Sequence, residues 1–284
     1  MAGAGGAPAP MNFNNPTAND GSGAQFTNLG YLANTRDNNR ESIIDLLNLN
    51  ASLKGLNSGF MVAVGAKLDL SRLYVVGHSL GGIAGTLFTS VNQAAIANDA
   101  LVGLPSNLNS IKGVVASVAG TQVSQIMVNS PTFGPTINGG LAAAGLPVGT
   151  SSYEKFVYSA QMMLDSADPV NFAQTLATQN VPVFVQQVNG DAVILNSIDS
   201  APLGGTQALV RLLGASQIGL GETTLGLGYV KINGGTHGSL LVPSAQTVDA
   251  GLVTAEMQAE VVSFVLNGGK VAVGSQSPSS VAAP

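Results

Sequence analysis

The sequence of 284 residues contains no cysteine and only two histidines. Without cysteine the chain can form neither a disulfide nor a thiolate zinc site, and it cannot use a thiol nucleophile. A chain of this length buries enough surface to fold without such links, and its length favours one domain. The absence of cysteine leaves the redox compartment open.

Charged residues are also scarce, at 9% of the sequence against 45% hydrophobic residues. Ordinary soluble domains carry about 25% charged residues, so uncharged polar residues and glycine must cover most of this surface. The composition favours a secreted or cell-surface protein that contacts apolar interfaces, and a plain secreted protein rich in small residues is the alternative. The chain has ten basic and fifteen acidic residues and a net charge of −5. This balance does not predict the basic surface that binding of nucleic acid requires.

Long hydrophobic runs are absent as well. No apolar run reaches the roughly 18 residues that a membrane span requires, so we expect no membrane span. The first ten residues, MAGAGGAPAP, have neither the basic nor the apolar region of a signal peptide. Residues 1–24 and 274–284 contain little to bury and are predicted to be a flexible leader and tail. Residues 25–273 are predicted to form the folded domain.

Apolar segments alternate with helical patterns along this domain. The predicted buried strands are Arg72 to Gly77, Lys112 to Ala119, Val181 to Val188 and Gly228 to Asn233. The predicted helices are Thr35 to Leu53, Leu56 to Lys67, Gly82 to Asn98, Tyr153 to Leu164, Thr206 to Leu213 and Thr254 to Leu266. This alternation predicts an α/β fold whose mostly parallel sheet has helices on both faces. Residues 121–168 show no strand pattern and are predicted to be an inserted helical cap.

The first predicted strand runs directly into Gly77-His78-Ser79-Leu80-Gly81. A G-x-S-x-G sequence between a strand and a helix is typical of a nucleophile elbow, in which the glycines let strand and helix approach closely. The elbow would point the Ser79 hydroxyl out of the sheet. It would also place the Leu80 amide at a helix N-terminus, where it can donate to an oxyanion.

A serine nucleophile needs a general base, and His237 is the candidate. His78 lies inside the elbow, where its side chain is expected to point away from Ser79. His237 follows the last predicted strand, at the sheet edge where such folds place chemistry. The orienting acid should follow a strand between these residues. Asp191 meets this condition, Asp199 is the runner-up, and Asp168 is predicted to cap a helix that begins with proline.

These residues predict acyl transfer: His237 takes the proton of Ser79, and Ser79 attacks an ester carbonyl. Asp191 would hold the imidazole in the required tautomer, and water would hydrolyse the acyl-enzyme. Acyl-ester or lipid substrates are expected. The S-x-x-K match at Ser152 to Lys155 lacks the K-T-G element that accompanies it in penicillin-recognising enzymes. No phosphate-binding glycine motif occurs, and two histidines without neighbouring carboxylates predict neither a metal nor a cofactor.

At these residues the chain resembles the α/β-hydrolase superfamily and, within it, the extracellular lipase and phospholipase group of Gram-negative bacteria. The resemblance runs from about Ser22 to Leu266, through LYVVGHSLGGIAGT, DSADPVNFAQTL, NGDAVILNS and THGSLLVPS. It implies Ser79 as the nucleophile, Asp191 as the acid, His237 as the base, and hydrolysis of carboxylic esters.

The chain departs from the superfamily before the elbow. In the superfamily, several strands precede the elbow. A His-Gly loop also precedes it and provides a second oxyanion amide. Here only 78 residues precede Ser79. Either the second amide comes from a segment such as Asn57 to Met61, or N-terminal strands of the usual sheet are reduced or missing. An open sheet edge invites pairing, which predicts a homodimer or a fragment of a larger lipase. The alternative function is a weak or inactive binding protein with an incomplete oxyanion hole.

Overall fold

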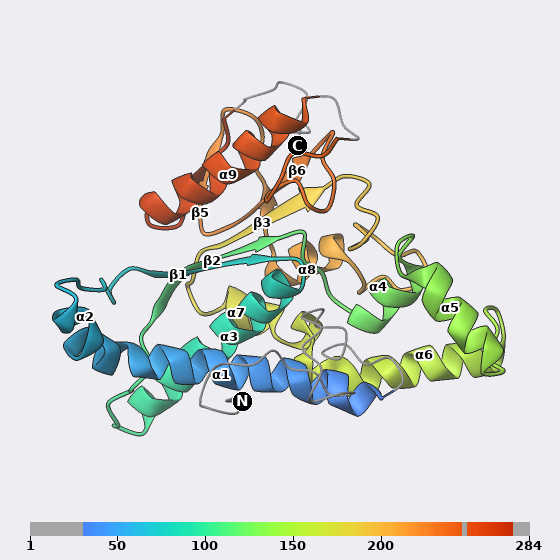
Figure 1. The fold of residues 1–284 in the computed structure, drawn as a ribbon, viewed down its shortest axis with the longest axis horizontal. Helices are drawn as coiled ribbons and strands as arrows, with labels where there is room; N and C mark the ends of the chain where they lie inside the picture. The colour runs from blue at the N-terminus through green and yellow to red at the C-terminus, as the bar shows by residue number, and fades with distance from the viewer. Residues whose placement is uncertain (1–30, 246–248, 275–284) are drawn as a thin grey trace.

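A computed structural model describes residues 31–245 and 249–274 of the chain. Helices and strands alternate through most of this range (Figure 1). In chain order the elements are α1 (Leu32–Ser58), α2 (Phe60–Ala63), β1 (Leu73–His78), α3 (Leu80–Leu101), β2 (Ile111–Ser117), α4 (Val123–Asn129), α5 (Gly134–Ala143), α6 (Ser151–Leu164), η1 (Asp165–Ala167), η2 (Pro169–Asn171), α7 (Ala173–Ala177), β3 (Val183–Val188), α8 (Thr206–Leu213), β4 (Ser216–Gln217), β5 (Thr223–Leu225), β6 (Leu227–Ile232), α9 (Ala250–Leu266) and β7 (Lys270–Ala272).

The central sheet has five strands in the order β1-β2-β3-β6-β4, and each neighbouring pair is parallel. All four predicted strands are present in it. The apolar residues of β2 and β3 are buried on both faces, as is usual for parallel strands. A separate antiparallel pair, β5 with β7, was not predicted.

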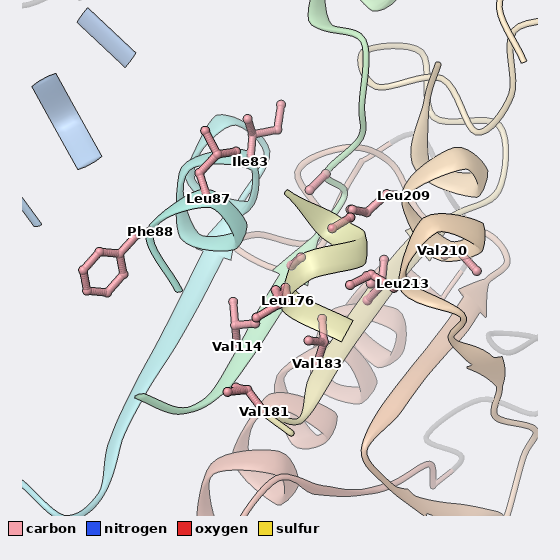
Figure 2. Close-up of a cluster of buried hydrophobic side chains, with 14 of the residues drawn as sticks. Ile83, Leu87, Phe88, Val114, Leu176, Val181, Val183, Leu209, Val210 and Leu213 are labelled. Atoms are coloured by element: carbon pink, nitrogen blue, oxygen red, sulfur yellow. The ribbon is translucent and has the colours of Figure 1, made fainter. Parts of the chain in front are cut away.

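Helices cover both faces of the sheet, as Figure 1 shows: α9 lies on one side, and α1, α3 and α7 lie on the other. The core on the second side contains Leu87 of α3, Val114 of β2, Leu176 of α7 and Leu209 of α8 (Figure 2). On the α9 side, Met257 and further apolar residues pack against alternate residues of the same strands. The arrangement confirms the predicted α/β fold, a parallel sheet with helices on both faces.

Helix α1 is fixed to the rest of the fold by buried amides. The Asn50 Nδ2 group donates to the Asn92 side chain at 2.8 Å and to the Asn109 carbonyl at 2.9 Å. The Asn109 amide donates in return to Asn50 Oδ1 at 2.9 Å. Buried polar groups that are paired specify one packing geometry, so these bonds set how α1 lies on α3 and on the segment that leads into β2.

Two parts of the helix prediction are corrected. The expected second helix, Leu56 to Lys67, does not form as such: α1 continues to Ser58, and only the single turn of α2 follows. Phe60 and Val62 of that turn are exposed, so no buried face extends it into a longer helix. Residues 121–168 are helical as expected, but they also contain α4 and α5, which were not predicted individually.

Helices α4, α5 and α6 lie together beyond the end of the sheet toward which β1 and β2 run (Figure 1); they are called the cap helices below. No strand precedes β1 within residues 31–72. The predicted leader, residues 1–24, lies outside the described residues, as do residues 275–284 of the predicted tail. None of the described helices is long and apolar enough to cross a membrane.

Candidate active site

Ser79 lies at the sharp turn between β1 and α3. Its φ of 54° and ψ of −122° place a non-glycine residue in a strained backbone region, and such strain concentrates at functional sites. The Ser79 amide donates to the Ser117 carbonyl of β2 at 2.9 Å, which fixes the turn to the sheet. Leu80 is the first residue of α3. Its amide therefore has no acceptor within the helix and lies at the positive end of the helix dipole.

Close packing at this turn requires glycine at Gly77 and Gly82. A Cβ atom at Gly77 would lie 2.2 Å from the Gly81 carbonyl oxygen, and one at Gly82 would lie 2.8 Å from the Ala119 Cβ. A Cβ atom at Gly81 would meet nothing within 4 Å. The second close approach thus involves Gly82, and the prediction that assigned it to Gly81 is wrong.

The three candidate residues meet at the C-terminal ends of β1, β3 and β6. His237 Nε2 lies 2.8 Å from Ser79 Oγ, and His237 Nδ1 lies 2.8 Å from Asp191 Oδ2. The Asp191 side chain is 1% exposed and the His237 side chain 19% exposed. The imidazole can therefore hydrogen-bond the serine and a buried carboxylate at the same time, which is the geometry that nucleophilic catalysis by serine requires.

Backbone amides hold the Asp191 carboxylate in place. Asp191 Oδ1 accepts hydrogen bonds from the amides of Val193 at 2.8 Å and Ile194 at 3.1 Å. Oδ2 is left for the imidazole. Such turns are typical of aspartate, whose short side chain reaches the backbone two residues ahead. The loop thus presents one carboxylate oxygen to His237 in a fixed orientation.

His78 lies closer to the site than the sequence suggested. Its ring centroid is 5.2 Å from that of His237, with the ring planes tilted by 54°. Burial lowers the pKa of His78, as does the positive charge that His237 carries when protonated, while Asp191 opposes the shift. The lowered pKa favours the neutral form of His78 beside the candidate base. No sequence pattern indicated this contact, since His78 was expected to point away from Ser79.

A buried polar row continues from His78 across the sheet. His78, Ser117 and Gln186 are register partners on β1, β2 and β3, so their side chains point to the same face. Gln186 Nε2 donates to Glu260 Oε2 of α9 at 2.6 Å. Four atoms of this row are buried without a hydrogen-bond partner among the described residues: His78 Nδ1, Ser117 Oγ, Gln186 Oε1 and Glu260 Oε1.

Glu260 is the strongly perturbed acid of this row. Burial raises the pKa of Glu260 from 4.5 to about 8, helped by the charge of Glu256 and opposed by the hydrogen bond from Gln186. An acid with this pKa holds its proton at neutral pH. The polar row therefore ends on α9 in an acid that is neutral at neutral pH.

The remaining candidate acids lie elsewhere. Asp199 is exposed and makes no hydrogen bond to His237. Asp168 is buried and caps η2, as predicted: it accepts from the amides of Val170, Gln122 and Val123. Burial raises the pKa of Asp168 against the lowering effect of these bonds. Its carboxylate thus joins η2 to the start of α4.

Two further sequence features are placed by the structure. Ser152 and Lys155, from the S-x-x-K match, are exposed on α6. The suggested source of a second oxyanion amide was Asn57 to Met61. This segment lies with α2 near the start of β1, away from the elbow (Figure 1). The Asn57 side chain is paired with the backbone of Leu68. That suggestion is therefore wrong. Within residues 31–245 and 249–274, no group of three His, Cys, Asp or Glu side chains is arranged to hold a metal.

The chain matches no known protein-family model and no curated protein. Among solved structures it is similar to carboxyl esterase 2 from the mycorrhizal fungus Tuber melanosporum, with 17% identity, a TM-score of 0.36, and coverage of 77% of this chain and 57% of that one. It is also similar to a mutant of the esterase rPPE in complex with (S)-Ac-CPA, with 16% identity, a TM-score of 0.36, and coverage of 77% and 55%. The chain thus spans little more than half the length of these esterases.

Proposed function

We propose that this protein is a serine carboxylic-ester hydrolase of the lipase or esterase type, within the α/β-hydrolase superfamily and its Gram-negative extracellular lipase group. The observation that carries the proposal is the pair of 2.8 Å contacts that join Ser79 to His237 and His237 to Asp191. Residues 25–273 form its catalytic domain, with residues 121–168 as the cap.

In the proposed reaction, His237 Nε2 takes the proton from Ser79 Oγ as that oxygen attacks the ester carbonyl carbon. The Leu80 amide donates to the oxyanion of the tetrahedral intermediate. Collapse of the intermediate expels the alcohol, which receives the proton from His237. Water then attacks the acyl-enzyme by the same steps, and the carboxylic acid leaves with Ser79 restored. Asp191 stabilises the imidazolium formed in each half-reaction.

Exposed apolar residues beside the site support lipid esters as the substrate class. Leu80 is 39% exposed, and Leu241 and Val242, which follow His237 closely in the chain, are 61% and 62% exposed. Apolar groups near a reaction centre can contact the surface of an aggregated lipid. These residues and the low charge of the chain support an enzyme that degrades lipids and is secreted or bound at the cell surface. Such an enzyme would bind the lipid interface without spanning the bilayer.

The decisive test is hydrolysis of p-nitrophenyl esters, from acetyl to palmitoyl, by the full chain. We expect turnover that Ser79→Ala abolishes and that Ser152→Ala, on the exposed face of α6, leaves unchanged. Circular dichroism would check that both variants fold. Turnover retained by a folded Ser79→Ala variant would refute the proposal. Absence of turnover in the unmodified chain would instead favour the alternative, a binding protein whose oxyanion hole is incomplete.

A further inference from the structure

A cavity of about 470 Å³ lies among the cap helices and the start of α1. Its wall includes Leu32 of α1, Met127 of α4, Leu141 of α5 and Phe156 of α6. Cavities that bind small molecules have volumes of about 300 to 1,000 Å³. This cavity is therefore large enough for a ligand of that size.

The residues that line the cavity are mostly apolar. None of the lining residues is charged, and Thr35, Ser124 and Thr136 are the polar side chains among them. Ser124 Oγ is already bonded to Gln161 Oε1 at 2.7 Å, and Thr35 also has a polar interaction of its own. Small residues, Gly140 and Ala160 among them, keep the space open. The chemistry therefore fits an uncharged, flexible aliphatic chain, held by burial of its methylene groups.

Helix α4 separates this cavity from the loop that carries Asp191. Val123 and Met127 of α4 line the cavity. Ile126, on the other face of the helix, packs in a separate cluster with Ile194 and Ile198 of the Asp191 loop. Neither Ser79, Asp191 nor His237 lines the cavity. It is therefore distinct in its lining from the candidate active site.

We propose that this cavity is a second binding site, which holds the aliphatic chain of a fatty acid independently of Ser79. Its ligand contacts the face of α4 opposite to the one that packs on the Asp191 loop. The site therefore goes beyond the proposed ester hydrolysis and does not depend on turnover.

Two adjacent glycines on α5 give a matched test. Gly140 lines the cavity and Gly139 does not, and a Cβ atom added at either position meets nothing within 4 Å. Gly140→Leu should fill the cavity, whereas Gly139→Leu should add the same side chain outside it. Both changes replace a helical glycine and should be tolerated by the fold.

The probe is cis-parinaric acid, a fatty acid whose fluorescence rises on transfer to an apolar site, titrated into the full chain. We expect saturable binding that Gly139→Leu leaves within about twofold and that Gly140→Leu weakens at least about tenfold, since the leucine occupies space needed by the chain. Equal affinities in the three proteins would overturn the proposal, as would the absence of saturable binding.

A second arm separates this site from ester hydrolysis. Ser79→Ala and protein labelled at Ser79 by a short-chain fluorophosphonate should both bind the probe as the unmodified chain does. Binding lost on labelling would show that the probe occupies the substrate site, and the proposal of a second site would be wrong. Binding retained by a chain without esterase turnover would sustain this inference while the proposed function failed.

Discussion

His237 Nδ1 lies 2.8 Å from Asp191 Oδ2, although 46 residues separate the two in the chain. Parallel strands β3 and β6 are neighbours in register, from Val183 with Leu227 to Val188 with Ile232. The loops that follow these strands therefore emerge side by side, and each supplies one of the two residues. The contact is a consequence of the strand order, and its contribution to catalysis can be tested by substitution.

Asp191→Asn should lower kcat by about 10³- to 10⁴-fold with little change in fold. The asparagine oxygen can still accept from Val193 and Ile194, so its amide group would face His237. That group donates a hydrogen bond to Nδ1 and cannot accept one from it, so the imidazole would adopt the tautomer with its proton on Nε2, toward Ser79. Such a tautomer cannot act as the base. Steady-state kinetics with a p-nitrophenyl ester would measure the loss.

Asp199→Asn is the matched control, since it makes the same chemical change on an exposed residue of the same loop. It should keep kcat within about twofold, as expected for a surface substitution. If Asp199→Asn lowered kcat as strongly as Asp191→Asn, the assignment of the acid would be wrong.

The glycines of the elbow should differ in their tolerance of alanine. Gly77→Ala places a Cβ atom 2.2 Å from the Gly81 carbonyl oxygen, and neither backbone segment can move without distorting the turn. It should lower the free energy of unfolding by about 3 kcal/mol or more. Gly81→Ala meets no atom within 4 Å and should leave that free energy unchanged or slightly raised. Urea unfolding would measure both, and equal destabilisation by the two changes would contradict the packing described.

Much of the sheet is predictable from the sequence because each buried strand is a short apolar run between chain-breaking residues. The helix Thr206–Leu213 was predicted with its observed ends, since glycines flank it on both sides and Gly214 adopts a left-handed conformation there. By contrast, β4 has two residues, and β5 and β7 have three each. Strands this short form through pairing with distant segments, which leaves no local pattern to detect.

The candidate site, like the fold, could be predicted only in part. Ser79, His237 and Asp191 could be selected because a sharp turn or a strand end precedes each of them. The contact between His78 and His237 could not, because it depends on how the loop after β6 folds back over β1. Nor does the sequence show that Ser117, Gln186 and Glu260 extend a polar row from His78, since register between strands is a property of the assembled sheet.

Glu260 should make stability depend on pH. Its pKa is raised from 4.5 to about 8 in the folded chain, so between these values the folded state holds a proton that the unfolded state releases. The contribution of Glu260 to stability should therefore be greatest at acidic pH and be lost as the pH rises from about 4.5 to 8, by up to about 1.4 kcal/mol per pH unit. Glu260→Gln, a neutral mimic of the protonated acid, should remove this slope and be more stable than the unmodified chain at pH 8.

Urea unfolding at several pH values would measure this effect. Glu154→Gln provides the control, because Glu154 is exposed on α6 and its loss should leave the slope unchanged. Parallel pH profiles for the unmodified chain and Glu260→Gln would show that Glu260 is ionised in the folded state at neutral pH.

The outer edge of β1 should mediate a homodimer, which we propose as the assembly in solution. Within the described residues no strand pairs with that edge, and Val76 on β1 is 49% exposed. Exposed strand edges pair readily, and a lysine there opposes pairing. Light scattering should give twice 28.5 kDa, or 57 kDa, for the unmodified chain. Val76→Lys should give the monomer mass, and Val102→Lys, at an exposed site after α3, should stay dimeric. A monomer mass for the unmodified chain at micromolar concentration would exclude this dimer.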